Sequence, residues 1–350
     1  MIKKLSILLA TFLTVTAFSG CNQTANSGFA GTYWLTSPSF TGVDETCYEK
    51  LQYDITCETE TDYAPKISGD SSLKFSIHPR SSYVTELYSE NGLYVYKTTL
   101  SIFGEYKYGE DNTVAVEDFT QTETTFKGME HGFAPVKTVK TVSNIVPMVA
   151  HPNDKSDFVT VKATITTEYG EKNAVHTLTA SDAVSKNYLS ALKEPVTVRK
   201  YNKDKYIDNE LMLLLFRNFK YENSLSYTFK SIESATGQLK GIKGSAKLET
   251  VQTGKESSTQ TTAIKTITIE NCDLGDSAYD RDFNAFGVTF ATTGEYGQNF
   301  AYAYYANSVG DNLTDLDNES RHYMVKLYRP AIYNTCYIVY TLSSATNVRP

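Results

Sequence analysis

Residues 158–167 alternate between apolar and polar side chains, the pattern of a strand with one buried face. Val159, Val161, Ala163 and Ile165 share one face, while threonines and a lysine occupy the other. Strand-forming residues are abundant throughout, since the chain has 26 tyrosines and 17 phenylalanines against one tryptophan. The sequence therefore predicts a mostly antiparallel sheet. Further strands are expected at 47–57, 73–77, 93–103, 136–146, 226–232, 239–248, 263–270, 286–292, 300–305, 323–328 and 336–342.

Two helices are expected in the middle of the chain, near residues 181–193 and 208–219. Ser181 can cap the first, and Pro195 ends it. The second begins at Asp208 or Asn209, and its body from Leu211 to Phe216 is apolar nearly all round. A helix without a polar face is buried on several sides or lies in an apolar groove. Strands, two central helices and more strands indicate an antiparallel α+β fold.

The first residues predict export. Lys3 and Lys4 precede an apolar run, which ends in small residues just before Cys21, as in a secretory signal peptide. Ser19-Gly20-Cys21 resembles the lipobox of bacterial lipoproteins, although Phe18 stands where leucine is usual. The resemblance implies a signal peptide over 1–20, lipidation of Cys21 and anchoring to a bacterial cell membrane from outside the cytoplasm. An ordinary signal peptide with an incidental cysteine is the alternative.

The rest of the chain is expected to form a short polar tether over residues 21–30 and one large β-rich domain over 31–350. The net charge is −7, and it becomes −9 without residues 1–20, which hold two lysines and no acid. Such a charge argues against nucleic acid and against electrostatic binding to anionic lipid as partners. Membrane attachment then depends on the acyl chains at Cys21, of which at least two are needed for a stable anchor.

Four cysteines remain besides Cys21, and an even number in an exported chain favours disulfides. If residues 47–57 form a single strand, Cys47 and Cys57 lie about 33 Å apart at about 3.3 Å per residue. They are then too distant to bond to each other. Their partners are Cys272, Cys336 or none.

Catalytic and metal-binding motifs are not found in the sequence. Its five histidines are widely separated, no Gly-x-Ser-x-Gly motif occurs, and no cysteine spacing suits zinc. Asp315, Asp317 and Glu319 alternate like the start of a calcium loop, but the required glycine and distal glutamate are missing. A solvated acidic loop is therefore the favoured interpretation. We expect neither an enzyme nor a protein that binds a metal or cofactor.

The region from Tyr206 to Leu211, with the leucines and the Arg217-Asn218-Phe219 that follow, resembles a segment of exported lipoproteins with a half-open β-barrel. The Lol lipoprotein carrier and the mycobacterial lipid-carrying lipoproteins share that fold. The resemblance covers residues 195–345 and implies a strongly curved, half-barrel sheet whose concave side is partly filled by helices. It also implies an acyl chain or other apolar ligand in that concavity. It places Leu211, Leu214, Leu215 and Phe216 on the ligand. A plain hydrophobic core at these four positions is the alternative.

The sequence therefore favours a non-enzymatic lipoprotein that binds or carries an apolar ligand. A second hypothesis is a protein- or glycan-binding surface built from exposed tyrosines such as Tyr302, Tyr304 and Tyr305. Sheet propensity alone can also explain the tyrosines. A hydrolase is a third hypothesis, which no motif supports.

Overall fold

Successive antiparallel hairpins build one side of the molecule. The computed structural model describes residues 48–59, 72–128, 131, 133–198, 201, 206–218, 226–233, 242–252, 260–292, 299–309 and 322–347. Asn91 and Gly92 have positive φ angles of 52° and 76°, and two such residues form the tight turn between β3 and β4. These hairpins comprise β2 (Lys74–Ile77), β3 (Ser82–Glu90), β4 (Leu93–Tyr108), β5 (Asn112–Phe126), β6 (Pro135–Pro147), β7 (Phe158–Tyr169) and β8 (Ala174–Ala180).

The remaining strands come from both ends of the described chain. Among the described residues, seventeen strands form one sheet, and β13 and β14 form a separate two-stranded ribbon. The remaining strands are β1 (Tyr48–Glu58), β9 (Val196–Val198), β10 (Tyr206–Asp208), β11 (Ser226–Ile232), β12 (Ile242–Leu248), β13 (Thr250–Gln252), β14 (Gln260–Thr262), β15 (Ile264–Asp273), β16 (Ala278–Thr292), β17 (Asn299–Val309), β18 (Met324–Pro330) and β19 (Tyr337–Thr346).

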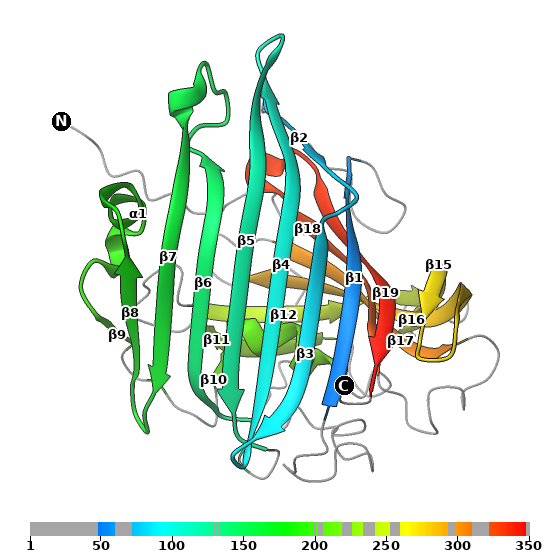
Figure 1. Cartoon of the computed structure of the whole chain (residues 1–350). Coiled ribbons are helices and arrows are strands. Elements are labelled where there is room, and N and C mark those ends of the chain that lie inside the picture. Colours follow the sequence, from blue (N-terminus) through cyan, green and yellow to red (C-terminus); the bar gives the residue numbers. More distant parts are fainter. Residues whose placement is uncertain are drawn as a thin grey trace.

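The sheet follows a single path from one edge to the other. Its order is β9–β8–β7–β6–β5–β4–β3–β1–β19–β18–β17–β16–β12–β11–β10. β2 pairs with the last part of β4, and β15 with the first part of β16. Pairing is antiparallel except between β10 and β11 and at one β15–β19 contact. Figure 1 shows β3–β7 as a broad wall of long strands, with β11 and β12 crossing behind it. The expected curved antiparallel sheet is thus confirmed.

Side chains join the two ends of this sheet. Tyr201, which follows β9, packs its ring 5.5 Å from that of Tyr169 in β7 and 5.7 Å from that of Tyr206 in β10. Ala174, Val198 and Ile232 complete this small buried cluster. We call these six residues the seam. It brings the two edges of the sheet together through side-chain packing.

The expected pair of central helices is not what the structure contains. α1 (Ala183–Tyr188) has six residues and lies at the sheet margin beside β8 in Figure 1, where its Val184 is 48% exposed. Its N-cap is Asp182, whose side chain accepts a hydrogen bond from the Ser185 amide. The second helical region is interior, but its α-helical part α2 (Met212–Leu215) has four residues. Short 3-10 turns make up the rest: η2 (Lys155–Asp157), η3 (Ser190–Leu192), η4 (Asn209–Leu211), η5 (Phe216–Asn218) and η7 (Ile332–Asn334).

The main core lies inside the curve of the sheet. It combines residues distant in the sequence, among them Tyr53, Phe126, Phe216, Phe290 and Leu342, each at most 1% exposed. Burial alternates along β7 as the sequence pattern predicts, with Val161, Ala163 and Ile165 buried. No helix within the described ranges is long and apolar enough to cross a bilayer.

Candidate functional site

A segment of helical turns crosses the inside of the curved sheet. It comprises residues 206–218, which form β10, η4, α2 and η5, and we call it the inner segment. The Tyr305 hydroxyl in β17 donates a hydrogen bond to the Leu213 carbonyl at 3.2 Å. His322 donates from Nδ1 to the Arg217 carbonyl at 2.9 Å. The inner segment is therefore held from the β17 side along its second half.

Two carboxylates attach the first half of the inner segment to the opposite wall. Thr138 of β6 donates to Asp208 Oδ2 at 2.6 Å, and the Tyr169 hydroxyl of β7 donates to the same oxygen. Lys140 of β6 forms an ion pair with Glu210 at 2.7 Å. Asp208 also caps η4 by accepting from the Glu210 amide at 2.7 Å, so the expected N-cap at Asp208 is confirmed. We call Asp208, Glu210, Thr138, Lys140 and Tyr169 the anchor cluster.

The two acids of the anchor cluster have pKa values shifted in opposite directions. Burial raises the pKa of Asp208 to about 6, and the neighbouring Glu210 carboxylate adds to the rise. Burial also acts to raise the pKa of Glu210, but the Lys140 ammonium outweighs it and lowers that pKa. Asp208 therefore exchanges a proton near pH 6 while Glu210 stays ionised. Because Asp208 and Thr138 are only 3% and 1% exposed, the cluster serves to hold the segment in place.

Arg217 ties the far end of the inner segment to β1. Its guanidinium forms two hydrogen bonds with the Glu49 carboxylate, at 2.6 and 2.9 Å, and both side chains are at most 3% exposed. Burial acts to lower the pKa of Arg217, but the charge and hydrogen bonds of Glu49, helped by Tyr53 and Tyr323, raise that pKa above its usual value. The inner segment is thus tied ionically to β1 and β6, strands that lie well apart in the sheet.

The four side chains expected to contact a ligand lie in the core. Leu211, Leu214, Leu215 and Phe216 are at most 1% exposed. Phe216 packs edge-to-face on Phe290, with ring centroids 4.6 Å apart. The four side chains are buried among core residues, which agrees with the alternative interpretation of a plain hydrophobic core. Ligand contact at these four positions stays a prediction.

Another part of the inner face keeps partial exposure. Tyr83, Leu100, Thr120 and Val142 are directly opposite one another across β3, β4, β5 and β6. All four are half-buried. Thr120 shares its strand face with Thr122, whose hydroxyl donates to Glu210 at 3.4 Å, so the row faces inward. Lys140 and Glu210 beside it are 20% and 19% exposed. We call the four residues the inner row, and it is a part of the concave face that keeps partial exposure.

The tyrosines expected on the surface are not exposed. Tyr304 and Tyr305 are at most 1% exposed, and Tyr302 is half-buried beside the ring of Tyr337. Tyr304 donates to Glu249 at 2.8 Å on one face of β17, and Tyr305 reaches the inner segment on the other. Both faces of β17 are covered, which corrects the expectation of an exposed aromatic patch at these positions.

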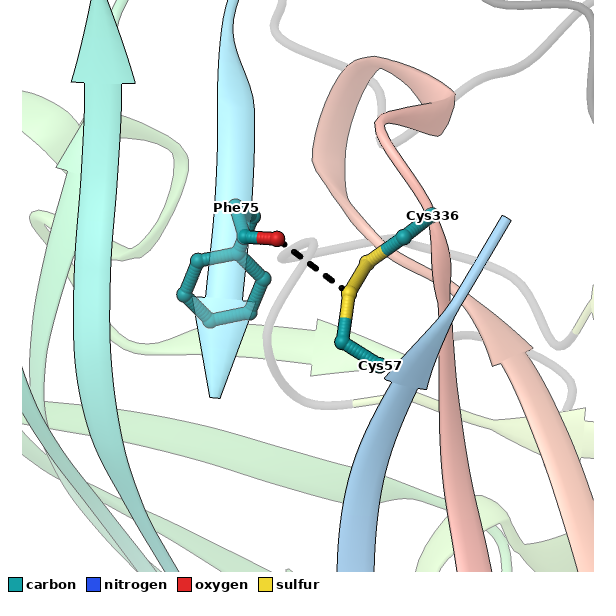
Figure 2. The surroundings of a disulfide bond; sticks show 3 residues. All are labelled: Cys57, Phe75 and Cys336. Atoms are coloured by element: carbon teal, nitrogen blue, oxygen red, sulfur yellow. Dashed lines mark hydrogen bonds between the residues drawn. A yellow bond between two sulfur atoms is a disulfide. The ribbon is translucent and has the colours of Figure 1, made fainter. Parts of the chain in front are cut away.

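One disulfide joins the ends of the described chain. Cys57 at the end of β1 bonds to Cys336 just before β19, and Cys57 Sγ lies 3.3 Å from the Phe75 carbonyl oxygen of β2 (Figure 2). This is one of the pairings the sequence leaves open. Cys272 is a buried free thiol. Cys21 and Cys47 lie outside the described residues, as do Asp315, Asp317 and Glu319.

Sequence reasoning missed the two ionic ties of the inner segment. Arg217 and Glu210 flank an apolar run, and a charge placed beside a buried run needs a buried partner. That signal predicts an ion pair at each end of the apolar run. It does not identify Glu49 and Lys140 as the partners, because these residues lie in strands distant in the sequence.

No protein-family model matches the sequence, and no curated protein matches it. Among solved structures, one match is the crystal structure of a beta-barrel-like protein of the domain of unknown function DUF1849 from Brucella abortus. The chains are 9% identical over 85% of this chain and 96% of that chain, with a TM-score of 0.47. The resemblance of residues 195–345 to the Lol carrier and the mycobacterial lipoproteins stays a prediction.

Proposed function

We propose that this protein is an exported lipoprotein, anchored through acyl chains on Cys21, that binds an apolar or amphiphilic ligand on its curved sheet without catalysing a reaction. The observation that carries the proposal is the inner row. Tyr83, Leu100 and Val142 keep apolar surface exposed on the concave side of the sheet. Apolar surface in a concave setting with a few polar groups nearby is the usual composition of a small-molecule site.

In this proposal the ligand lies on the sheet, beside the helical turns of the inner segment. The inner segment fills one part of the concavity and packs into the core. Thr120 and the Lys140–Glu210 pair lie beside the inner row and supply polar groups that can orient a ligand. A chain that lies along the row crosses four strands, which spans about 14 Å at about 4.8 Å between strands. That length accommodates a medium acyl chain.

Binding is tested with the fluorescent apolar probe 1-N-phenylnaphthylamine and the folded full chain. Val142→Lys introduces a charge on the inner row, while Thr141→Lys places the same charge on the opposite face of β6. We expect Val142→Lys to weaken binding at least tenfold and Thr141→Lys to bind like the wild type. Equal affinity of the two variants, or no binding by the wild type, contradicts the proposal.

Anchoring is tested in cells by fractionation and by labelling with an alkyne-tagged fatty acid. Cys21→Ser should abolish the label and move the protein out of the membrane fraction. Cys47→Ser is the matched control and should keep both properties. A Cys21→Ser protein that stays with the membrane would exclude the acyl anchor.

A further inference from the structure

Asp118 is an inward-facing acid that forms no ion pair with a described lysine or arginine. It lies on β5 directly opposite Ile102 of β4 and on the same face as Thr120 of the inner row. Its Oδ1 accepts a hydrogen bond from the Ile145 amide at 2.6 Å. The Asp118 side chain is half-buried, so its carboxylate is partly desolvated and still accessible to a ligand.

Asp118 acts electrostatically on the Tyr106 hydroxyl, and further aromatic side chains from separate elements contact Tyr106 or the adjoining end of β6. The ring of Tyr106 in β4 lies 5.7 Å from that of Phe158 in β7 and stacks at 4.7 Å on Phe75 of β2. Phe158 is opposite Pro147 in the sheet, and the Pro147 carbonyl accepts from the Tyr333 hydroxyl at 3.4 Å. We call Tyr106, Phe158 and Tyr333 the aromatic group. Its contacts lead back to β6 next to Ile145, the residue that binds Asp118.

Electrostatics link the same residues. Burial raises the pKa of Tyr106, and the Asp118 carboxylate and the Tyr188 hydroxyl of α1 raise it further. Tyr188 also adds to the raised pKa of Tyr333, for which burial is the larger cause. Burial raises the pKa of Asp118 itself to about 7, against the opposing effect of the Ile145 hydrogen bond. Electrostatic effects thus link Asp118 to Tyr106, Tyr106 to Tyr188 and Tyr188 to Tyr333.

Tyr333 is held in an unusual backbone conformation. Its φ is 54° and that of Asn334 is also 54°, in the left-handed region that side chains other than glycine seldom adopt. The tyrosine is half-buried, and its hydroxyl meets the β6–β7 side of the cluster. Such strain persists only where the surrounding structure imposes it, and it is common at ligand-binding positions.

We propose that Asp118 and the aromatic group bind the positively charged ammonium head group of an amphiphile, whose apolar chain lies on the inner row. This rests on the ligand binding proposed above and adds the chemical class of the head group. A partly desolvated carboxylate without a counter-ion gains most from a cation, and aromatic faces attract ammonium groups. Thr120 connects the two parts, since it is two residues from Asp118 on the same strand face.

The test compares amphiphiles that share a twelve-carbon chain and differ in head group, by isothermal titration calorimetry on the folded full chain. The probes are dodecyltrimethylammonium, neutral dodecanol and anionic dodecanoate, each below its aggregation concentration. We expect the wild type to bind the ammonium probe at least tenfold more tightly than dodecanol, and dodecanoate most weakly. Asp118→Asn, which keeps an acceptor for the Ile145 amide, should reduce the ammonium preference to within twofold.

Glu117→Gln is the matched control, because Glu117 is the neighbouring acid on the opposite face with a side chain 73% exposed. It should keep the full ammonium preference. Phe158→Leu retains the carboxylate and should weaken ammonium binding more than dodecanol binding. If Asp118→Asn does not fold, Phe158→Leu provides the test of the head-group site.

Each outcome has a distinct meaning. An unchanged ammonium preference in Asp118→Asn, or equal weakening of both probes by Phe158→Leu, overturns the assignment of the head-group site. Equal wild-type affinity for all three head groups overturns it too, while leaving the inner row as an apolar binding site. If the wild type binds none of the probes, the proposed function fails together with this inference.

Discussion

Arg217 and Glu49 form a buried, two-pronged ion pair between the inner segment and β1, with Nη1–Oε1 and Nη2–Oε2 distances of 2.6 and 2.9 Å. The pair joins residues 168 positions apart in the sequence. It fixes the end of the inner segment that lies farthest from the anchor cluster, beyond the apolar side chains that the segment packs into the core. The pair therefore sets the register of the segment against the sheet.

Breaking this pair from one side should strongly destabilise the protein. Arg217→Met leaves the Glu49 carboxylate buried without its partner, and such changes cost about 3–5 kcal/mol. Urea unfolding monitored by circular dichroism measures the loss. The double variant Arg217→Met with Glu49→Leu should recover a large part of it, because no charge is left unpaired. A double variant no more stable than Arg217→Met would show that the pair is not the cause.

The disulfide should contribute substantially to stability. Replacing Cys57 and Cys336 by serine removes a link between residues 279 apart, and removal of such a link costs about 2–5 kcal/mol. Wild-type protein in reductant should approach the thermal midpoint of the double variant. The double variant itself should be insensitive to reductant, since the buried Cys272 is not part of the link. A reductant effect of equal size on both proteins would contradict this.

Asp208 should make stability fall as the pH rises. Its pKa in the folded state is raised from 3.8 to about 6, so the folded protein binds more protons than the unfolded chain between these values. The contribution is present below about pH 4 and is lost as the pH rises through 6, with a magnitude of about 2–3 kcal/mol. Asp208→Asn should remove this dependence. The measurement is the difference in unfolding free energy between variant and wild type, taken from pH 4 to 7; a difference that stays flat would contradict the prediction.

His176 should have the opposite effect on stability. Burial lowers its pKa from 6.5 to about 4; Nδ1 bonds the Thr167 hydroxyl at 2.9 Å, while Nε2 has no partner among the described residues. The unfolded chain then binds more protons between pH 4 and 6.5, so stability is lost as the pH falls through this range, by about 2–3 kcal/mol. His176→Leu should abolish that loss. His151→Gln, at an exposed position, serves as the control and should leave the acid dependence unchanged.

The strands could be predicted from sequence because each carries its own signal. Alternation in residues 158–167 and the Asn91-Gly92 turn depend only on neighbouring residues, and both are confirmed. The helices were less predictable. The apolar run at 211–216 indicates burial but not length, and the surrounding sheet leaves room for a single α-helical turn flanked by 3-10 turns.

The candidate site was hardly predictable, because its parts come from strands far apart in the sequence. The tyrosines of residues 300–305 suggest an exposed aromatic surface, yet Tyr304 and Tyr305 are both buried by elements distant in the sequence. Asp118 has no distinguishing neighbours in the sequence either. Its environment arises only when β4 and β6 pair with and hydrogen-bond to its part of β5 in the folded sheet.

The position of β1 determines when the sheet can be completed. β1 pairs with β3 along one edge and with β19 along the other. The first described strand in the sequence therefore cannot complete its pairing until the last one has been synthesised. During synthesis, its unsatisfied amide and carbonyl groups present an open edge until almost the whole chain has emerged. A nascent chain is therefore most prone to pair with another copy in the interval before β19 arrives. Loss of β19 would open the sheet in its middle rather than shorten it at an edge.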